Sequence, residues 1–341
     1  MKEIRTEDAV GHVLCHDITQ IIKDEKKGVL FKKGHIVREE DIPALLSVGK
    51  EHLYVWEKQE GILHENEAAE ILYRISADIH MHGSDIKEGK IELIADCDGV
   101  LKIRRDALLA VNSLGEMMIA SRHGDFPVKK GDKIAGTRII PLVIEKSKMD
   151  KAEKVAGTKP IFSILPYRSK KVGIITTGSE VQKGLIKDTF TPVLKEKLDE
   201  FSCQILGQTL PGDERSQITS DILSFIDQGA DMVICRGMSV DPDDRTPGAI
   251  KDTGAEIVTY GAPVLPGAML LLSYYQNNDK IIPILGLPGC VMYARRTVFD
   301  LILPRIMADD RICADEIASY GEGGLCLNCD VCTFPNCGFG K

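Results

Sequence analysis

The sequence predicts an α/β fold with a mostly parallel sheet, preceded by smaller α+β and β-rich domains. Between Lys171 and Pro304, short apolar runs alternate with helical patterns. Each run leads into a loop of glycine, acidic and hydroxyl residues. Such a βαβ alternation is typical of parallel sheets, whose strand ends carry the ligand-binding loops.

The composition favours a soluble protein with a small ligand. The 341 residues include 43 Lys and Arg against 51 Asp and Glu, a formal net charge of −8, with 5% aromatic residues and no long basic run. This balance argues against nucleic-acid and membrane-surface partners. No apolar stretch of roughly 18 residues is present, and the charged N-terminus differs from a signal peptide. We therefore expect a cytoplasmic protein.

Two smaller units are expected before the main domain. Residues 1–60 contain a short helix pattern at 38–49 between two strands, with a glycine at its end. Residues 61–150 begin with a helix at 64–80 and continue as strands, which predicts a β-rich module. The helix would bury a stripe that consists of Ala68, Ile71, Leu72, Ile75 and Ile79. The polar run at 145–158 predicts a linker to a domain at 160–312.

The main domain is expected to begin with a buried strand at 171–177. A glycine-containing loop at 178–184 follows, and then a helix with Pro192 in its first turn. Free backbone N–H groups at a helix N-terminus suit a phosphate or another oxyanion. Further strands are expected at 203–210, 231–235, 256–260 and 281–285, and a last helix from Met292 to Leu303, ended by Pro304.

The loop at 236–248 is the strongest catalytic candidate. It follows a buried strand and contains Asp241, Asp243 and Asp244. Carboxylates so close together repel one another unless a cation or a donor-rich ligand lies among them. The loop therefore predicts a site for one or the other.

Five short motifs, taken in order, resemble the molybdopterin-binding domain of the molybdopterin molybdenumtransferases and adenylyltransferases. They are Thr-Gly-Ser-Glu at 177–180, Pro-Gly-Asp-Glu at 211–214, Gly-Met-Ser at 237–239 with Asp244, Pro-Gly at 266–267, and Gly-Leu-Pro-Gly at 286–289. The resemblance covers about residues 168–308, and the succession of motifs makes it specific. It implies a three-layer αβα domain and a homodimer.

The resemblance also implies a ligand and roles for residues. The pocket would take molybdopterin or adenylyl-molybdopterin, with phosphate near Gly178 and the helix that follows. Glu180, Asp213 and Asp244 match the family's acidic positions and would hold Mg²⁺ and position molybdate or the phosphoanhydride. The ligand-binding residues would be Thr177, Gly178, Ser179, Gly237, Ser239, Thr246, Pro266, Gly267, Pro288 and Gly289.

Three functions follow from this resemblance. The first is molybdate insertion with release of AMP, in which the partners are the pterin, molybdate and a molybdoenzyme or another cofactor-biosynthesis protein. The second is a non-catalytic carrier of the molybdenum cofactor. The third is nucleotide processing similar to that of the competence-damage-inducible family.

The last segment, 313–341, predicts a metal-binding tail. Cys326, Cys329, Cys332 and Cys337 form a C-x2-C-x2-C-x4-C pattern. Four thiolates so close in sequence can surround one metal centre without help from the rest of the fold. The spacing suits Zn²⁺ and an iron–sulfur cluster, and both stay open. A reduced tail and a pair of disulfides are the alternatives.

Overall fold

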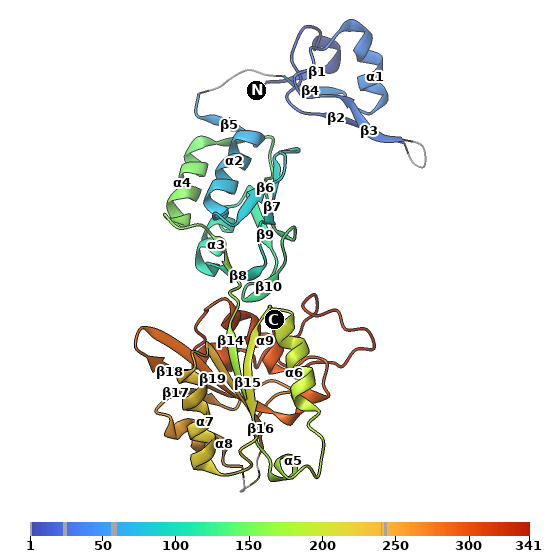
Figure 1. Cartoon of the computed structure of the whole chain (residues 1–341). Coiled ribbons are helices and arrows are strands. Elements are labelled where there is room, and N and C mark those ends of the chain that lie inside the picture. The colour runs from blue at the N-terminus through green and yellow to red at the C-terminus, as the bar shows by residue number, and fades with distance from the viewer. Residues whose placement is uncertain (1, 23–25, 56–59, 240, 242–243) are drawn as a thin grey trace. The chain divides into compact units, whose positions relative to one another are not determined.

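The structure is a computed structural model that describes residues 2–22, 26–55, 60–239, 241 and 244–341. The chain divides into two compact units (Figure 1). One comprises the residues up to Ile94, together with Arg104–Arg122 and Lys133–Phe162. The other comprises Ala95–Ile103, His123–Asp132 and Ser163–Lys341. No helix of the described chain has both the length and the apolar character needed to span a membrane.

The first unit is built from small antiparallel sheets. The paired strands are β1 (Lys2–Arg5) with β4 (His52–Val55), β2 (Ile18–Ile22) with β3 (Lys26–Phe31), and β5 (Ile62–His64) with β12 (Val143–Glu145). A four-stranded sheet has the order β6 (Met81–Gly83), β7 (Lys90–Ala95), β11 (Lys133–Ile139) and β9 (Met117–Ser121). The helices are α1 (Ile42–Ser47), α2 (Glu65–Ser76), α3 (Arg105–Asn112) and α4 (Lys146–Ala156).

Two sequence-based predictions for this unit are wrong. The run predicted as a linker at 145–158 forms α4, because Met149, Ala152 and Ala156 are buried at helical spacing between exposed lysines. Helix α2 ends at Ser76 instead of continuing to 80. Ile79, expected in its buried stripe, is 90% exposed.

The second unit contains a six-stranded mixed sheet, which confirms the predicted α/β class. Its order is β15 (Gln204–Thr209), β14 (Lys171–Thr176), β16 (Met232–Met238), β19 (Lys280–Pro288), β18 (Leu271–Asn277) and β17 (Glu256–Tyr260). The first four strands are parallel. Strand β18, which the sequence analysis missed, runs antiparallel to both of its neighbours.

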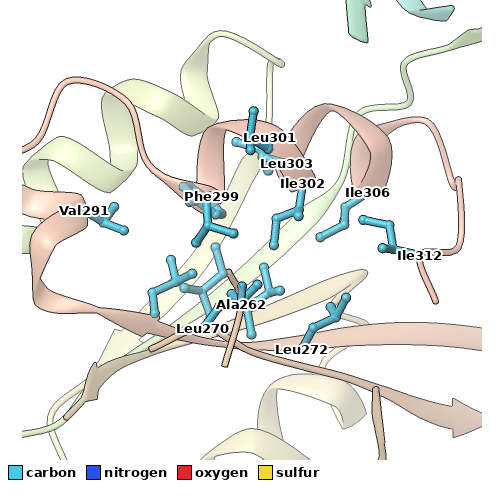
Figure 2. Close-up of a cluster of buried hydrophobic side chains, with 14 of the residues drawn as sticks. Ala262, Leu270, Leu272, Val291, Phe299, Leu301, Ile302, Leu303, Ile306 and Ile312 are labelled. Carbon is cyan, nitrogen blue, oxygen red and sulfur yellow. The ribbon is translucent and has the colours of Figure 1, made fainter. Parts of the chain in front are cut away.

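Helices cover both faces of this sheet and complete three layers (Figure 1). Helices α6 (Phe190–Asp199) and α9 (Val298–Met307) pack on one face, and α7 (Arg215–Asp227) and α8 (Thr246–Asp252) on the other. Ile174 of β14 contributes to the first apolar layer and Ile175 to the second, as strand alternation requires. Figure 2 shows Phe299, Ile302 and Ile306 directed from α9 toward the sheet.

Helix α9 begins later than predicted and continues through Pro304. The segment Gly289–Met292 forms only a short 3-10 turn, η3. The Thr297 hydroxyl accepts a hydrogen bond from the Phe299 N–H at 3.2 Å, and the Asp300 carboxylate accepts one from the Thr297 N–H at 2.8 Å. This capping box fixes the start of the helix. Pro304 removes only one intrahelical hydrogen bond, and the packed face of α9 compensates for it.

A three-stranded sheet also belongs to the second unit. Its order is β10 (Phe126–Val128), β8 (Gly99–Ile103) and β13 (Phe162–Pro166). Helix α9 packs against β8 and β10. The aromatic ring of Phe126 therefore joins the same apolar layer as α9.

Arg305 of α9 is a buried cation that connects three segments. Its Nε donates to Asp310 and its Nη2 donates to Glu316 of α10 (Ala314–Ser319), both at 2.6 Å, and its side chain is only 2% exposed. Asp310 also accepts a hydrogen bond from Lys102 of β8 at 2.9 Å. Burial alone would lower the pKa of Arg305, but Asp310 raises this pKa overall, so the guanidinium stays charged.

Arg305→Met is expected to lower the free energy of unfolding by about 3 kcal/mol, because Asp310 would keep a largely buried charge with one cation fewer. Arg168→Met is the control, since it removes an ion pair between Asp309 and a 75% exposed arginine. That change should cost less than about 1 kcal/mol. Urea denaturation measures both, and equal losses would contradict the role given to Arg305.

Candidate functional site

The candidate site lies where the strand order of the parallel sheet reverses. From β14 the chain passes through α6 to β15 on one side, and then through α7 to β16 on the other. The loops that leave the carboxyl ends of β14 and β16 therefore diverge to opposite faces of the sheet. Such a topological switch point is the usual position of ligands in open α/β sheets.

The chain directly after β14 contacts the end of β16, where Thr177 lies against Gly237. Gly237 has a φ of +119°, and a Cβ atom added there would lie 1.9 Å from Thr177 Oγ1. The Thr177 hydroxyl donates to the Arg236 carbonyl and lies 3.4 Å from the Thr246 hydroxyl. Thr177 and Thr246 are both buried. The structure thus brings together three residues that the motifs predicted as ligand-binding.

The loop after β16 is folded around the Asp244 carboxylate. Asp244 Oδ2 accepts a hydrogen bond from the Ser239 N–H at 2.8 Å, and Oδ1 accepts one from the Thr246 N–H at 2.9 Å. The Ser239 hydroxyl accepts a hydrogen bond from the Asp241 N–H at 3.2 Å. The Asp244 carboxylate therefore connects the two ends of the loop, at Ser239 and at the start of α8. Asp243, the third predicted acid, lies outside the described residues.

Asp188 occupies the N-terminus of α6, where the sequence analysis expected a phosphate. Asp188 Oδ1 accepts hydrogen bonds from the N–H groups of Phe190 at 3.0 Å and Thr191 at 3.1 Å. Partial burial alone would raise the pKa of Asp188, but hydrogen bonds from Thr191, Gln208 and the backbone hold this pKa below its ordinary value. The prediction that these N–H groups are free is therefore wrong, because a side chain two residues upstream caps them.

Arg236 is a partly unsatisfied cation beside this cap. It forms the last pair between β16 and β14, with Thr176 as its partner. Its Nη1 lies 3.6 Å from Asp188 Oδ1, and its guanidinium lies 5.5 Å from the centre of the Phe190 ring. The Nη1 atom is buried and has no hydrogen-bond partner among the described residues. Sequence reasoning missed Asp188, whereas Arg236 is the first residue of the loop at 236–248 that it named as the strongest catalytic candidate.

Two further motifs lie next to the same edge. Gly212, in the loop after β15, has a φ of +68°, and its Cβ position is 2.5 Å from the Gln182 amide oxygen. The loops that contain Asp213 and α5 (Ser179–Gln182) are therefore neighbours. The side chains of Ser179 and Glu180 lie outside the described residues, so the predicted role of Glu180 stays a prediction.

The Pro-Gly motifs form corners. The Pro266 carbonyl accepts a hydrogen bond from the Val298 N–H at 3.1 Å, and a Cβ atom on Gly267 would lie 2.6 Å from Val298 Cγ1. This corner therefore packs against the start of α9. Pro288 ends β19, and Gly289 opens η3. Their predicted contacts with a ligand stay predictions.

Metal sites were predicted at two places. In the part of the chain that the structure describes, no three His, Cys, Asp or Glu side chains are grouped so that they could hold a metal ion. Asp213 and Asp244 are among these described residues. So are Cys326, Cys329, Cys332 and Cys337, none of which forms a disulfide. Both metal sites remain predictions.

Comparison with known proteins relates most of the second unit to a protein family. Residues 173–308 match the family model "Probable molybdopterin binding domain", and residues 3–57 match a domain of unknown function. The molybdopterin molybdenumtransferase of Synechococcus elongatus is 25% identical over 193 residues, 54% of this chain and 44% of that protein. That of Haemophilus influenzae is 26% identical over 236 residues, 66% of this chain and 54% of that protein. The chain thus spans about half the length of these relatives.

Other similarities cover shorter or more distant regions. A CinA-like protein of Mycolicibacterium gilvum is 34% identical over 79 residues, 23% of this chain and 19% of that protein. The tungsten cofactor synthesizing protein MoaB from Pyrococcus furiosus is a solved structure with 16% identity and a TM-score of 0.35. The aligned region covers 42% of this chain and 99% of that one.

The sheet and its switch point define an α/β protein with a candidate ligand site at the carboxyl edge of its parallel strands. More particularly, residues 173–308 match the family model of a probable molybdopterin binding domain. The recognition of this family from the five motifs is therefore confirmed.

Gly237→Ala is expected to lower the free energy of unfolding by about 2–4 kcal/mol, because the new methyl group meets Thr177 and the positive φ is strained. Gly229→Ala is the matched control, since Gly229 has a φ of +86° but open space around its Cβ position. That variant should lose only about 1 kcal/mol. Chemical denaturation compares the two, and a Gly237→Ala loss no larger than the control would refute the close approach.

Asp188→Asn is expected to lower the free energy of unfolding by roughly 1 kcal/mol near neutral pH, because the charge at the α6 N-terminus and beside Arg236 is lost. The folded-state pKa of Asp188 lies below its ordinary value of 3.8, so its contribution is present above that value. It is lost as the pH falls through the folded-state pKa. Denaturation curves at several pH values should show the variant and the parent converging under acid conditions, and a constant difference would disprove the assignment.

Proposed function

We propose that the chain binds molybdopterin or adenylyl-molybdopterin at the switch point and acts in molybdenum cofactor biosynthesis, by molybdate insertion with release of AMP. The observation that carries this proposal is the contact of two motif segments at Thr177 and Gly237, with Thr246 next to them and the buried Nη1 atom of a partly buried arginine nearby. We also propose that the protein acts in the cytoplasm and forms a homodimer.

Arg236 is the group that we propose for the phosphate. A buried donor without a partner costs roughly 1–3 kcal/mol, and more when it is charged. An oxyanion of the ligand would satisfy Nη1 through a charge-assisted hydrogen bond. Asp188 would keep the guanidinium in place, since its Oδ1 atom lies 3.6 Å from Nη1. The phosphate would thus be recognised by a side chain and not by the N-terminus of α6.

Asp213, Asp244 and Glu180 are the residues that we propose for Mg²⁺. Each Asp244 oxygen accepts one backbone hydrogen bond, which leaves lone pairs on both oxygens for a cation. Mg²⁺ commonly takes one or two carboxylates and completes its shell with water and phosphate oxygens, so this donor set fits it. When bound, the ion would neutralise phosphate charge and polarise the phosphoanhydride.

The remaining motif residues would orient the ligand. The Ser239 hydroxyl is held by the Asp241 N–H and can still donate to a ligand oxygen. Gly178 would allow close approach of a ligand to the backbone, because it lacks a side chain and has a positive φ. Gly289 has no such φ and would allow approach only because it lacks a side chain. Gly237 and Gly267 leave room for Thr177 and Val298, and so would shape the site from behind.

Two other functions would give different experimental results. A carrier would bind the pterin without releasing AMP. The similarity of 79 residues to a CinA-like protein favours the third candidate, a nucleotide-processing activity. Incubation with adenylyl-molybdopterin, molybdate and Mg²⁺ separates the first two by AMP release, and turnover of nicotinamide nucleotides would support the third.

Arg236→Met is expected to weaken binding of adenylyl-molybdopterin by about 10- to 100-fold, because one charge-assisted hydrogen bond is lost. Arg236→Lys keeps the charge and should recover part of the affinity. Arg168→Met, an exposed position just before the amino end of β14, is the control and should bind like the parent. Titration calorimetry under anaerobic conditions measures these affinities. Undiminished binding by a folded Arg236→Met protein would exclude this phosphate site.

A further inference from the structure

The C-terminal tail encloses a cavity of about 270 Å³ that the proposed function does not use. All four cysteines of the C-x2-C-x2-C-x4-C pattern line it, and their thiols are free. We call it the cysteine cavity. The wall also contains two arginines and several apolar groups, among them Arg295, Arg296, Leu325, Leu327, Phe334 and Phe339.

The segments on both sides of the cysteine cavity are fixed to the second unit. Before it, the Cys326 N–H donates to the Leu265 carbonyl, and the Leu265 N–H donates to the Gly324 carbonyl, both at 2.8 Å. After it, Phe339 is buried in the apolar layer under α9, and Phe334 packs against that layer. The four cysteines therefore belong to an ordered wall, in which Cys329 and Cys332 are the exposed members.

Two cations lie at the cavity. Arg295 Nη1 donates to the carbonyls of Cys329 at 3.2 Å and Asp330 at 2.6 Å. Arg296 lies 5.0 Å from the centre of the Phe334 ring and donates to Asp300 at 2.9 Å. Burial alone would lower the pKa of Arg296, but Asp300 and a hydrogen bond with the Cys332 side chain raise this pKa overall. The two arginines therefore place positive charge next to the cysteines of the wall.

The size of the cavity favours a cluster over a single ion. Four sulfurs bound to one Zn²⁺ lie about 2.3 Å from the same point. Here the four cysteines line a cavity of about 270 Å³, which is more space than a single ion fills. A polynuclear centre contacts the wall at four separate points, and a cluster with four thiolates carries negative charge that the two arginines would offset.

We propose that Cys326, Cys329, Cys332 and Cys337 hold a [4Fe–4S] cluster in the cysteine cavity. The cluster enters by ligand exchange from a cluster that already carries four small thiolate ligands. Each protein thiol forms one Fe–S bond and one donor thiolate leaves. The proton of the protein thiol passes to the leaving thiolate. The iron and sulfide keep their oxidation states, so this step needs no further oxidant or reductant.

The test is anaerobic transfer from a synthetic [4Fe–4S] tetrathiolate cluster to the full chain, followed by desalting. We expect about four irons and four sulfides per chain, as this cluster type requires, together with its visible absorption. Retention of no iron would overturn the proposal. So would protein isolated with one zinc per chain that resists exchange, because this result would identify a mononuclear site.

Cys329→Ser should retain less than about half of the iron, since one of four ligands is lost. Cys313→Ser is the matched control, because Cys313 lies outside the cysteine cavity at the N-cap of α10, where serine is a favoured residue. Near-parental iron content in a folded Cys329→Ser protein would contradict the ligand assignment. The result for the parent protein does not depend on pterin binding, so failure of this proposal and failure of the proposed function can be distinguished.

Discussion

The close approach of Gly237 to Thr177 is the constraint on which the candidate site depends. Parallel pairing brings the ends of β14 and β16 side by side, with Thr176 opposite Arg236. The loops that follow these strands diverge to opposite faces of the sheet. A side chain at position 237 would collide with Thr177, so only glycine fits there. Because Thr177 donates to the Arg236 carbonyl and contacts Thr246, the same approach positions α8 and the Asp244 loop.

The arginine and the aspartate at this edge form one electrostatic unit. Asp188 satisfies the first N–H groups of α6 and also lies beside Arg236. The helix end is thereby neutralised, and the remaining positive charge is concentrated on a guanidinium that is only 15% exposed. A localised, geometrically fixed donor selects an anion more sharply than a helix dipole does, because its N–H groups have defined directions.

The features that could be predicted from the sequence are those that depend on local residue patterns. Strand ends, glycine turns and their motif order located the loops at 177–180 and 237–239, because period and turn chemistry are local signals. Sequence reasoning missed Asp188 and β18, whose roles depend on which strands become neighbours. It also mistook α4 for a linker, because the stripe of Met149, Ala152 and Ala156 is small and lies among lysines. Tertiary pairing decides such cases, and a single sequence does not specify it.

The cysteine cavity adjoins the elements that shape the proposed pterin site. Cys326 is hydrogen-bonded to Leu265, the residue before the Pro266 corner, and that corner supports the start of α9 through Val298. Arg295 and Arg296 lie in the chain between η3 and α9. Anything that binds the folded tail more tightly than the unfolded tail stabilises these contacts by mass action. A centre bound by the four cysteines would therefore stabilise the Leu265–Pro266 corner and the start of α9 without contacting the pterin.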